Sequence, residues 1–443
     1  MNFKRFIDPW FSVAGHHRIM ARYLFDPKIK KLMFNLPPQH GKTETVTISA
    51  PPFILGHNPD TRIISVAYNQ EQIQKYSFES MRMVENPRFY QLFGLLPDPS
   101  QFTKSYWKIK GHRGGVVASG VGSSITGNPA DWLFVDDPTK NIEEAFSKTF
   151  QDAIWDWWCY VAKTRMAGEA AKTVISVTRW GEDDLPGRIL KWERENNIPA
   201  EDRFTVVSLP AIDLTGVEDK KDYTRGRALW PEKKSLKFLI EMWRLNPTMF
   251  EALYQQNPCP EEDLALRSEW WTIVDSMGEE KLVKAIRGYD FGFRTRAQND
   301  FTATAKVGRY QSRWCLEECI QWKKNIPETI QEIKRIARQD GPGVPIVCET
   351  NGGQDAIVQM LKSDPDMGDY TIVGRDTKGD KFANAVPWIL RVKDGFLVMR
   401  RDAWNRDFLN QCDSFRRSSD HEDMIDAVSR CWALIGRMAS DIY

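Results

Sequence analysis

Short apolar runs and longer polar–apolar stretches alternate along the first part of the chain. The apolar runs have the length of buried strands, and the stretches after the first two show helical spacing. The runs are residues 30–36 (KKLMFNL), 61–68 (TRIISVAY), 131–138 (DWLFVDDP) and 172–178 (KTVISVT). This alternation predicts an α/β domain whose sheet is mainly parallel.

The pattern changes after about residue 210. Residues 227–271 contain helical segments interrupted by proline, without strand–helix alternation, which indicates a connector. Strands and helices then resume in a different order, consistent with a mixed sheet. The expected elements are a strand at 284–293, two hairpin strands within 299–322, a helix at 326–340, a strand within 344–349 and a helix at 418–437. With 443 residues, more than one core is expected. We expect an N-terminal domain (1–210), a connector (211–282) and a C-terminal domain (283–443).

A candidate phosphate-binding loop follows the first apolar run. The sequence PPQHGKT places Gly41, Lys42 and Thr43 between a predicted strand and a predicted helix, which is the context that such a loop requires. Backbone N–H groups at the helix start would hold phosphate oxygens, Lys42 would reach the β- and γ-phosphates, and Thr43 would bind Mg²⁺. The expected nucleotide-binding residues are Gln39, His40, Gly41, Lys42, Thr43, Glu44 and Asp136.

The run 131–138 supplies the acids that a nucleotide site needs. Asp136 follows four apolar residues, where a carboxylate on the Mg²⁺ side belongs, and Asp137 stands where a water-activating acid is found. The predicted cofactors of this site are ATP and Mg²⁺.

Carboxylates also mark the ends of predicted elements in the C-terminal part. Asp290 and Glu349 end two predicted strands, and Asp423 and Asp426 share one face of the last helix because they are three residues apart. Mg²⁺ or Mn²⁺ prefers oxygen ligands, and two such ions would stabilise the attacking and leaving oxygens of a phosphodiester. Asp423, Asp426 or both complete this candidate nuclease site. The order of elements resembles that of ribonuclease H-like nucleases.

Charge and cysteine content narrow the picture. The net charge of +1 excludes a protein that coats nucleic acid through a broad positive field, so any DNA contact is expected in a local groove. The seven Cys never form CxxC, and no His lies near Cys315 and Cys319, so we expect buried thiols and no zinc site. No run of 18 apolar residues predicts a membrane helix, so we expect a soluble protein of a reducing compartment.

Both parts together resemble the large terminase subunit of tailed double-stranded DNA bacteriophages, over nearly the whole chain. The resemblance rests on the succession PPQHGKT, GVGSSITGNPADWLFVDDPTKNIEEA, SVTRWGEDDLPGRIL, LWPEKKS, YQQNP, GYDFGF, GDKFANA and HEDMIDA. It implies a P-loop ATPase domain that translocates double-stranded DNA into a procapsid, and a ribonuclease H-like domain that cuts concatemeric DNA.

The resemblance also implies partners and residue roles. The partners are double-stranded DNA, the portal protein of the procapsid, the small terminase subunit and further copies in a ring. The resemblance also implies that the protein acts in the host cytoplasm and is not incorporated into the virion. By motif, the resemblance implies catalytic roles for Lys42 and Asp137 in the ATPase, and Ser176, Val177 and Thr178 resemble the coupling motif. Asp290, Glu349 and Asp423 resemble the nuclease triad. Asp300 and Asp426 resemble acids that support the triad or bind a second metal ion.

The chain departs from the family pattern at three positions. Leu36 stands at the usual first Gly of the loop, Gln39 replaces a frequent basic residue, and Asp137 replaces the more usual Glu, which shifts the place of the attacking water. The loop before Asp131 has no Arg, so an arginine finger must come from elsewhere, with Arg113 and Arg179 as candidates.

Other features have two interpretations. His16 and His17 line an adenine pocket or lie at the surface. Trp180 either senses the nucleotide together with Arg179 or is a packing residue of the fold. The pairs Arg400–Arg401 and Arg416–Arg417 contact DNA or form a solvated basic face.

Two other functions compete with a packaging motor. A helicase or repair ATPase fused to a nuclease should carry a second motor domain, and here the second half supplies Asp290 and Glu349 instead. A non-catalytic assembly protein does not require intact Lys42, Thr43 and Asp136.

Overall fold

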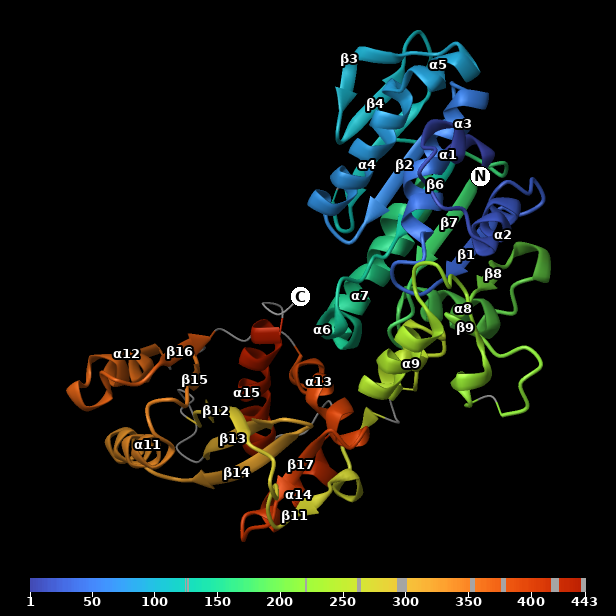
Figure 1. The fold of residues 1–443 in the computed structure, drawn as a ribbon. Helices are drawn as coiled ribbons and strands as arrows, with labels where there is room; N and C mark the ends of the chain where they lie inside the picture. The colour runs from blue at the N-terminus through green and yellow to red at the C-terminus, as the bar shows by residue number, and fades with distance from the viewer. Residues whose placement is uncertain are drawn as a thin grey trace. The chain divides into compact units, whose positions relative to one another are not determined.

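A computed structural model describes residues 1–123, 125, 127–219, 221–260, 264–292, 301–350, 355–375, 380–415 and 422–439. The chain divides into two compact units, Met1–Glu261 (unit 1) and Glu262–Tyr443 (unit 2) (Figure 1). The finer division into 1–210, 211–282 and 283–443 stays a prediction. No helix in these ranges is both long and apolar enough to cross a membrane.

Unit 1 is built on an eight-stranded sheet of order β3-β4-β5-β2-β6-β7-β1-β8 (Figure 1). All neighbours from β5 to β8 are parallel, and β3 and β4 pair antiparallel at one edge. The strands are β1 (Lys31–Asn35), β2 (Arg62–Ala67), β3 (Pro97–Thr103), β4 (Tyr106–Ile109), β5 (Gly115–Gly120), β6 (Trp132–Asp136), β7 (Lys172–Val177) and β8 (Thr205–Ser208). The four strands expected from the apolar runs are therefore confirmed as β1, β2, β6 and β7.

Helices cover both faces of this sheet, which explains why its central strands appear in the sequence as continuous apolar runs. Alternate residues of β1 enter opposite cores, since Phe34 packs on one side and Met33 on the other. The helical segments of this part are α1 (Asn2–Ile7), α2 (Gly15–Leu24), the π-helical turn η1 (Glu44–Ser49), α3 (Ala50–His57), α4 (Gln70–Glu85), α5 (Pro87–Phe93), α6 (Ile142–Phe146), α7 (Lys148–Trp157), the π-helical turn η2 (Trp158–Ala162) and α8 (Leu185–Glu195).

A small subdomain ends unit 1. Its elements are β9 (Ile212–Asp213), β10 (Arg227–Ala228), α9 (Leu236–Leu245) and α10 (Pro247–Leu253). It has its own core, in which Tyr223 and Phe250 pack with Leu239. In the described residues of 227–271, which are 227–260 and 264–271, β10 is the one strand and the helices α9 and α10 follow it, so strand–helix alternation is absent there, as expected.

Unit 2 contains a mixed seven-stranded sheet of order β11-β17-β14-β13-β12-β15-β16. The antiparallel hairpin strands lie at its centre and parallel strands extend it on both sides. The strands are β11 (Ile273–Val274), β12 (Leu282–Asp290), β13 (Thr302–Tyr310), β14 (Trp314–Trp322), β15 (Ile346–Glu349), β16 (Ile372–Arg375) and β17 (Leu397–Arg400), and the helices are α11 (Ile326–Asp340), α12 (Asp355–Ser363), α13 (Lys381–Lys393), α14 (Asn405–Ser414) and α15 (Asp423–Ala439).

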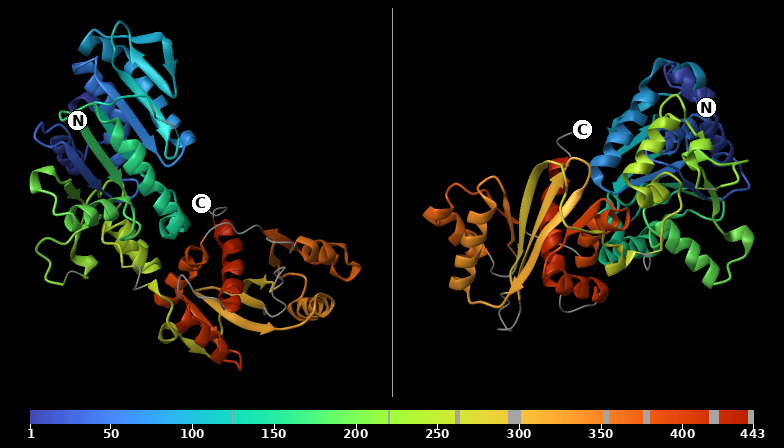
Figure 2. Two further views of the ribbon diagram at one scale, coloured as in Figure 1. Left: turned by 180° about the vertical axis from the view of Figure 1, so that it is seen from behind. Right: turned by 60° about the horizontal axis from the view of Figure 1, so that its bottom comes forward.

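The last helix, α15, lies along one face of this sheet, on the side opposite to α11 and α12 (Figure 2). Gly288 in β12 permits the close approach, because a Cβ atom there would lie 2.5 Å from the carbonyl oxygen of Ala427 and 2.8 Å from Sγ of Cys431. The absence of one side chain thus sets the distance between α15 and the end of β12.

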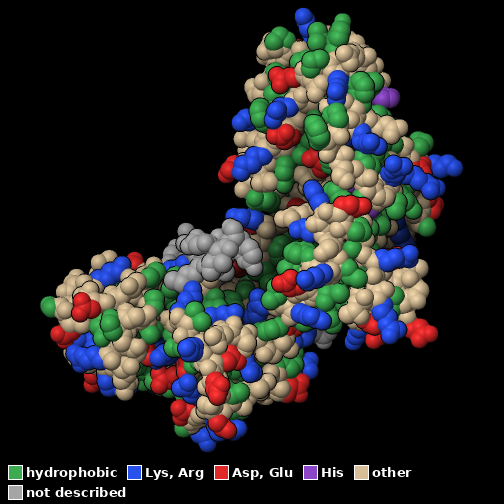
Figure 3. Space-filling view, in the orientation of Figure 1, with side chains coloured by type: hydrophobic (Ala, Val, Ile, Leu, Met, Phe, Trp, Pro, Cys, Tyr) green, Lys and Arg blue, Asp and Glu red, His purple; other side chains and the backbone are tan. Residues whose placement is uncertain are grey.

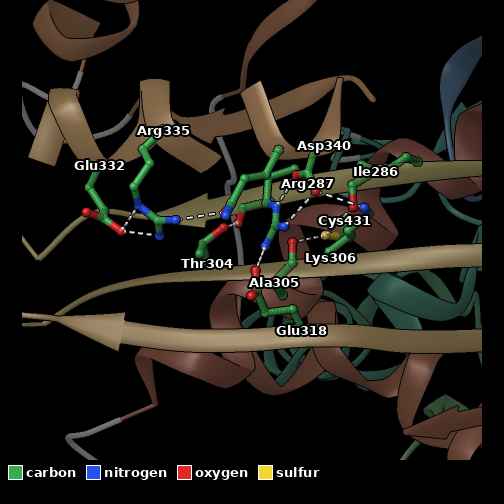
Figure 4. Close-up of polar contacts among 12 residues, drawn as sticks. Ile286, Arg287, Thr304, Ala305, Lys306, Glu318, Glu332, Arg335, Asp340 and Cys431 are labelled. Atoms are coloured by element: carbon green, nitrogen blue, oxygen red, sulfur yellow. Dashed lines mark hydrogen bonds and ion pairs between the residues drawn. The ribbon is translucent and has the colours of Figure 1, made fainter. Parts of the chain in front are cut away.

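A buried arginine ties the other face together. Arg287 of β12 lies between two acids, with Nε 2.7 Å from Oδ2 of Asp340 and Nη1 2.7 Å from Oε2 of Glu318, and Lys306 also contacts Asp340 (Figure 4). These ion pairs join α11 to three neighbouring strands, so we assign them a structural role. On the face drawn in Figure 3, acidic and basic side chains are interspersed.

Candidate active sites

The loop after β1 has the backbone of a phosphate-binding loop. Gln39 (φ 58°) and Gly41 (φ 77°) adopt left-handed conformations, and the N–H of Thr45 donates to the carbonyl of Gly41 to begin the helix. A Cβ atom at position 41 would lie 2.3 Å from Nε2 of His17. Both the φ angle and this contact therefore require glycine.

The parallel register places the predicted residues at one edge of the sheet. Strand β7 lies between β1 and β6, with Asn35 opposite Val177 and Asp136 opposite Ser176. The phosphate-binding loop, the Asp136–Asp137 pair and the 176–178 segment therefore meet at the carboxyl ends of three adjacent strands, where open α/β sheets bind ligands.

Lys42 connects the loop to the other two segments. Its Nζ atom donates to Oγ1 of Thr178 at 2.8 Å and lies 2.7 Å from Oδ2 of Asp137. The Thr178 hydroxyl donates in turn to the carbonyl of Leu36, at the end of β1. Lys42 is thus connected through Thr178 to the end of β1 and to the predicted coupling residues.

Asp137 is held in a fixed, strained conformation. Its φ of 40° is left-handed, its N–H donates to the carbonyl of Ser176, and its Oδ1 accepts from the N–H of Thr178 at 2.8 Å. Non-glycine residues in this region are uncommon, and surrounding contacts must impose the conformation. The backbone conformation of Asp137, and not its side-chain rotamer alone, therefore directs its carboxylate toward Lys42.

Asp136 has the character of a cation ligand. It is 1% exposed, and neither carboxylate oxygen has a hydrogen-bond partner among the described residues. Burial, reinforced by the adjacent Asp137 carboxylate, raises the pKa of Asp136 to about 7. The hydroxyls of Thr43 and Thr47 lie beside it. Buried oxygens without partners suit a hard divalent cation, so the donor set of Asp136 and Thr43 fits Mg²⁺.

A cavity of about 550 Å³ opens over the loop. It is lined by Gln39, Gly41, Lys42, Thr43, Glu44, Ile48, Tyr76, Lys233 and Lys234. A second cavity of about 510 Å³ shares Gly41, Glu44 and Lys233 with it and extends to the N-terminal residues Lys4, Trp10 and Phe11. The Trp10 side chain is 93% exposed there. The first cavity, which is polar, suits the phosphates of a nucleotide. The second cavity, with its exposed aromatic ring, suits the base.

Several sequence-based expectations about this site need correction. His16 and His17 lie neither at the surface nor among the residues that line the two cavities, since they are 2% and 0% exposed beneath the loop. Arg179 is 9% exposed, and its Nε lies 2.9 Å from Oδ2 of the buried Asp184, so it is a structural residue. Arg113 is exposed and stays a candidate finger. His40 and Glu44 stay predicted nucleotide-binding residues: the His40 side chain is buried, and Glu44, which lines the first cavity, forms an ion pair with Lys4.

The candidate nuclease site of unit 2 lies at the end of two parallel strands. Tyr289 pairs with Cys348, so the next residues, Asp290 and Glu349, end β12 and β15 side by side. Nη2 of Arg430 lies 3.2 Å from Oδ1 of Asp290 and also contacts Oε2 of Glu349. One guanidinium nitrogen thus bridges the two carboxylates.

Helix α15 brings a third carboxylate to this position. Asp426 is 4% exposed, and its Oδ2 lies 2.6 Å from Nζ of Lys381. Burial, together with the charge of Asp426, raises the pKa of Asp290 well above its usual range, although Arg430 opposes the shift. Asp423 lies in the first turn of the same helix and is partly exposed.

In the ranges that the structure describes, no three His, Cys, Asp or Glu side chains converge as a ready-made metal site. Asp290, Glu349 and Asp426 are instead interleaved with Arg430 and Lys381. Their carboxylate oxygens fit Mg²⁺ or Mn²⁺ chemically, and binding requires these two cations to move aside.

Other candidates have simpler outcomes. Asp300, Arg416 and Arg417 lie outside the described residues. Arg400 pairs with Glu317 and Arg401 with Asp275. Trp180 is partly buried, and its backbone N–H donates to the carboxylate of Asp184.

Apart from Lys42, sequence reasoning missed the cations near both sites. Lys233 and Lys234 lie in the quoted segment LWPEKKS, and Lys381 lies in GDKFANA, but neither segment has a periodicity that indicates a site. Arg430 is four residues after Asp426, and this helical spacing is the one available signal.

The fold and these sites define a two-part protein, in which a P-loop ATPase fold is followed by a ribonuclease H-like nuclease fold. Residues 33–230 match the family described as terminase large subunit, T4likevirus-type, N-terminal. Over these residues the chain is therefore similar to that family, and over nearly its whole length it has the fold of solved large terminase structures.

Solved structures support the assignment of the fold. The large terminase of a thermophilic bacteriophage is 9% identical, with a TM-score of 0.54 over 98% of both chains. The same protein in complex with ADP is 10% identical, with a TM-score of 0.56 over 95% of this chain and 98% of that one. Its complex with ATP-gamma-S gives 10% identity and a TM-score of 0.54 over 97% of both. No curated protein sequence matches significantly.

Proposed function

We propose that the chain is a DNA-packaging motor, in which unit 1 hydrolyses ATP to translocate double-stranded DNA and unit 2 cuts DNA as a metal-dependent endonuclease. The observation that carries the proposal is the network at the sheet edge, where Lys42 contacts both Asp137 and Thr178. It joins a phosphate-binding residue, an acid and the predicted coupling segment.

In unit 1, the loop N–H groups and Lys42 would bind the β- and γ-phosphates of ATP. Thr43 and Asp136 would hold Mg²⁺, which supplies charge neutralisation when bound. Asp137 would orient and deprotonate the attacking water once Lys42 leaves it for the phosphate. Thr178 contacts Lys42 and donates its backbone N–H to Asp137. It would therefore couple nucleotide binding and hydrolysis to the conformation at the end of β7. The ADP and ATP-gamma-S complexes of the thermophilic phage terminase support nucleotide binding.

In unit 2, Asp290 and Glu349 together with Asp426, Asp423 or both would hold Mg²⁺ or Mn²⁺. Bound metal supplies stabilisation of the attacking and leaving oxygens of a phosphodiester. Lys381 and Arg430 form ion pairs with these carboxylates. When metal displaces them, they would contact a DNA phosphate.

The partners follow from the family. We propose that the chain assembles as a ring on the portal protein of a procapsid, in the host cytoplasm, and receives concatemeric DNA from a small terminase subunit. It would leave the filled capsid and so be absent from the virion.

Three variants of the full chain test the two activities separately. ATP turnover and Mn²⁺-dependent plasmid cleavage are measured for the wild type, Lys42→Ala, Asp290→Ala and Glu349→Ala. We expect Lys42→Ala to lose ATP turnover and keep cleavage, and Asp290→Ala and Glu349→Ala to show the reverse. Unchanged turnover in Lys42→Ala would remove the ATPase assignment, and cleavage by both unit 2 variants would remove the nuclease assignment.

A further inference from the structure

The segment 229–234 is fixed beneath the phosphate-binding loop although it follows that loop by almost 190 residues. Trp230 is 1% exposed, and its ring centroid lies 5.3 Å from that of His16 and 4.6 Å from that of His17. Nε2 of His16 lies 2.8 Å from the carbonyl oxygen of His40, and the His17 ring touches Gly41. The two histidines therefore connect Trp230 to the loop by direct contacts.

The same segment turns sharply toward the cavity. The carbonyl of Trp230 accepts hydrogen bonds from the N–H groups of both Lys233 and Lys234. Nζ of Lys233 lies 4.7 Å from the Trp230 ring, and both lysines line the cavity that contains Lys42 and Thr43. Within the described residues, neither lysine has an acidic partner.

The charges at the cavity show what these lysines balance. Lys42 is matched by Asp137, and Glu44 by Lys4, while Asp136 adds a further acid. Without Lys233 and Lys234, these groups have no net positive charge that would attract the polyanionic tail of a nucleotide. With them it is positive, and charge-assisted contacts to phosphate become available.

We propose that Lys233 and Lys234 bind the phosphates of the nucleotide from within the same chain, and that Trp230 positions them through His16 and His17. This inference rests on the proposed ATPase function. It assigns a nucleotide-binding role to the end of unit 1 and explains why Trp230 and the two lysines are arranged around one turn.

Equilibrium binding of Mg·ADP to the full chain tests the proposal. Loss of two phosphate contacts in Lys233→Ala/Lys234→Ala should weaken binding about tenfold or more, and it should reduce the dependence of the Kd on salt. Lys237→Ala is the matched control, because Lys237 is an exposed lysine on α9 outside the residues that line the cavity. We expect an unchanged Kd for that variant.

The positioning role of Trp230 has its own readout. Trp230→Ala should weaken Mg·ADP binding, Trp230→Phe should restore most of it, and Trp230→Ala added to the double lysine variant should cost nothing further. An additional loss in that triple variant would mean that Trp230 acts independently of the lysines.

The outcomes separate this inference from the proposed function. Wild-type Kd in the double lysine variant, with binding lost in Lys42→Ala, would overturn the lysine assignment and leave the ATPase in place. Absence of Mg·ADP binding in the wild type would overturn both. Thermal unfolding of each variant excludes a general loss of fold as the cause.

Discussion

The Nζ atom of Lys42 lies 2.7 Å from Oδ2 of Asp137, so the proposed phosphate-binding lysine and the proposed water-activating acid form an ion pair. The Asp137 side chain is about one-third exposed and that of Lys42 is buried. A nucleotide phosphate must therefore compete with Asp137 for Lys42. The same competition releases Asp137 only when phosphate has arrived, which links the formation of the catalytic arrangement to binding.

The first prediction follows from this competition. Asp137→Asn should bind Mg·ADP a few-fold more tightly, because the charged competitor is gone. It should hydrolyse ATP at least about a hundredfold more slowly, because the general base is gone. Opposite changes in the two quantities are not expected from a simple disturbance of the loop. Isothermal titration and steady-state turnover measure them.

Asp131→Asn serves as the control for that prediction. Asp131 pairs with Arg62 at the opposite end of β6, so its removal should leave both quantities near wild type. Weaker ADP binding in Asp137→Asn would contradict the competition between phosphate and Asp137.

The second prediction concerns the third carboxylate of unit 2. Asp426 is buried beside Lys381, and its charge acts on Asp290, whereas Asp423 is three residues earlier and partly exposed. We expect Asp426→Asn to reduce Mn²⁺-dependent plasmid cleavage at least about a hundredfold, because a metal ligand is lost. Asp423→Asn should retain a larger fraction of the activity. The reverse order would make Asp423 the principal ligand on α15.

The third prediction uses the guanidinium that bridges Asp290 and Glu349. Arg430→Gln removes the guanidinium from the buried Asp290 and the partly buried Glu349, so the metal-free variant should unfold at a lower temperature, by an amount equivalent to roughly 3 kcal/mol. Mn²⁺ replaces the missing charge and no longer competes with Arg430. Its addition should therefore raise the unfolding temperature of the variant more than that of the wild type.

Arg287→Gln is the matched control, since Arg287 is also buried between two acids of unit 2 (Figure 4). It should destabilise the chain, and Mn²⁺ should give no additional recovery. An equal Mn²⁺ effect in both variants would mean that Arg430 does not occupy a metal position.

The sequence predicted the site residues whose positions follow from the apolar pattern of their own strand. Asp136, Asp290 and Glu349 follow apolar runs, and the ends of parallel strands meet at one edge, so their positions follow from strand prediction. Lys233 reaches the phosphate-binding loop only because Trp230 packs on His16 and His17, a contact between distant segments without a periodic signal. Arg430 reaches Asp290 because Gly288 lets α15 approach β12, which the sequence of α15 alone does not indicate.

The fourth prediction concerns the acid sensitivity of unit 1. His17 is 0% exposed, and burial, followed by the neighbouring His16, lowers its pKa to about 3. In the unfolded chain the pKa is about 6.5. Between these values the unfolded state binds the proton and the folded state does not. The stability that this group contributes is therefore complete above about pH 6.5 and is lost as the pH falls toward 3, at up to about 1.4 kcal/mol per pH unit.

His17→Gln removes this titration while it keeps a polar side chain next to Gly41. The positive charge of Lys233 favours the neutral His17 ring, and so does any charge on His16 or His40, whose own pKa values burial lowers, whereas the hydrogen bond with the His40 backbone opposes this shift. The variant should be less stable than the wild type at pH 7.5 but should lose less stability between pH 6.5 and pH 5. Urea unfolding of the full chain measures this, with the transition of unit 1 identified as the one that Mg·ADP shifts. His57→Gln, at an exposed position of α3, should keep the wild-type slope, and an equally steep slope in His17→Gln would show that another group causes the acid sensitivity.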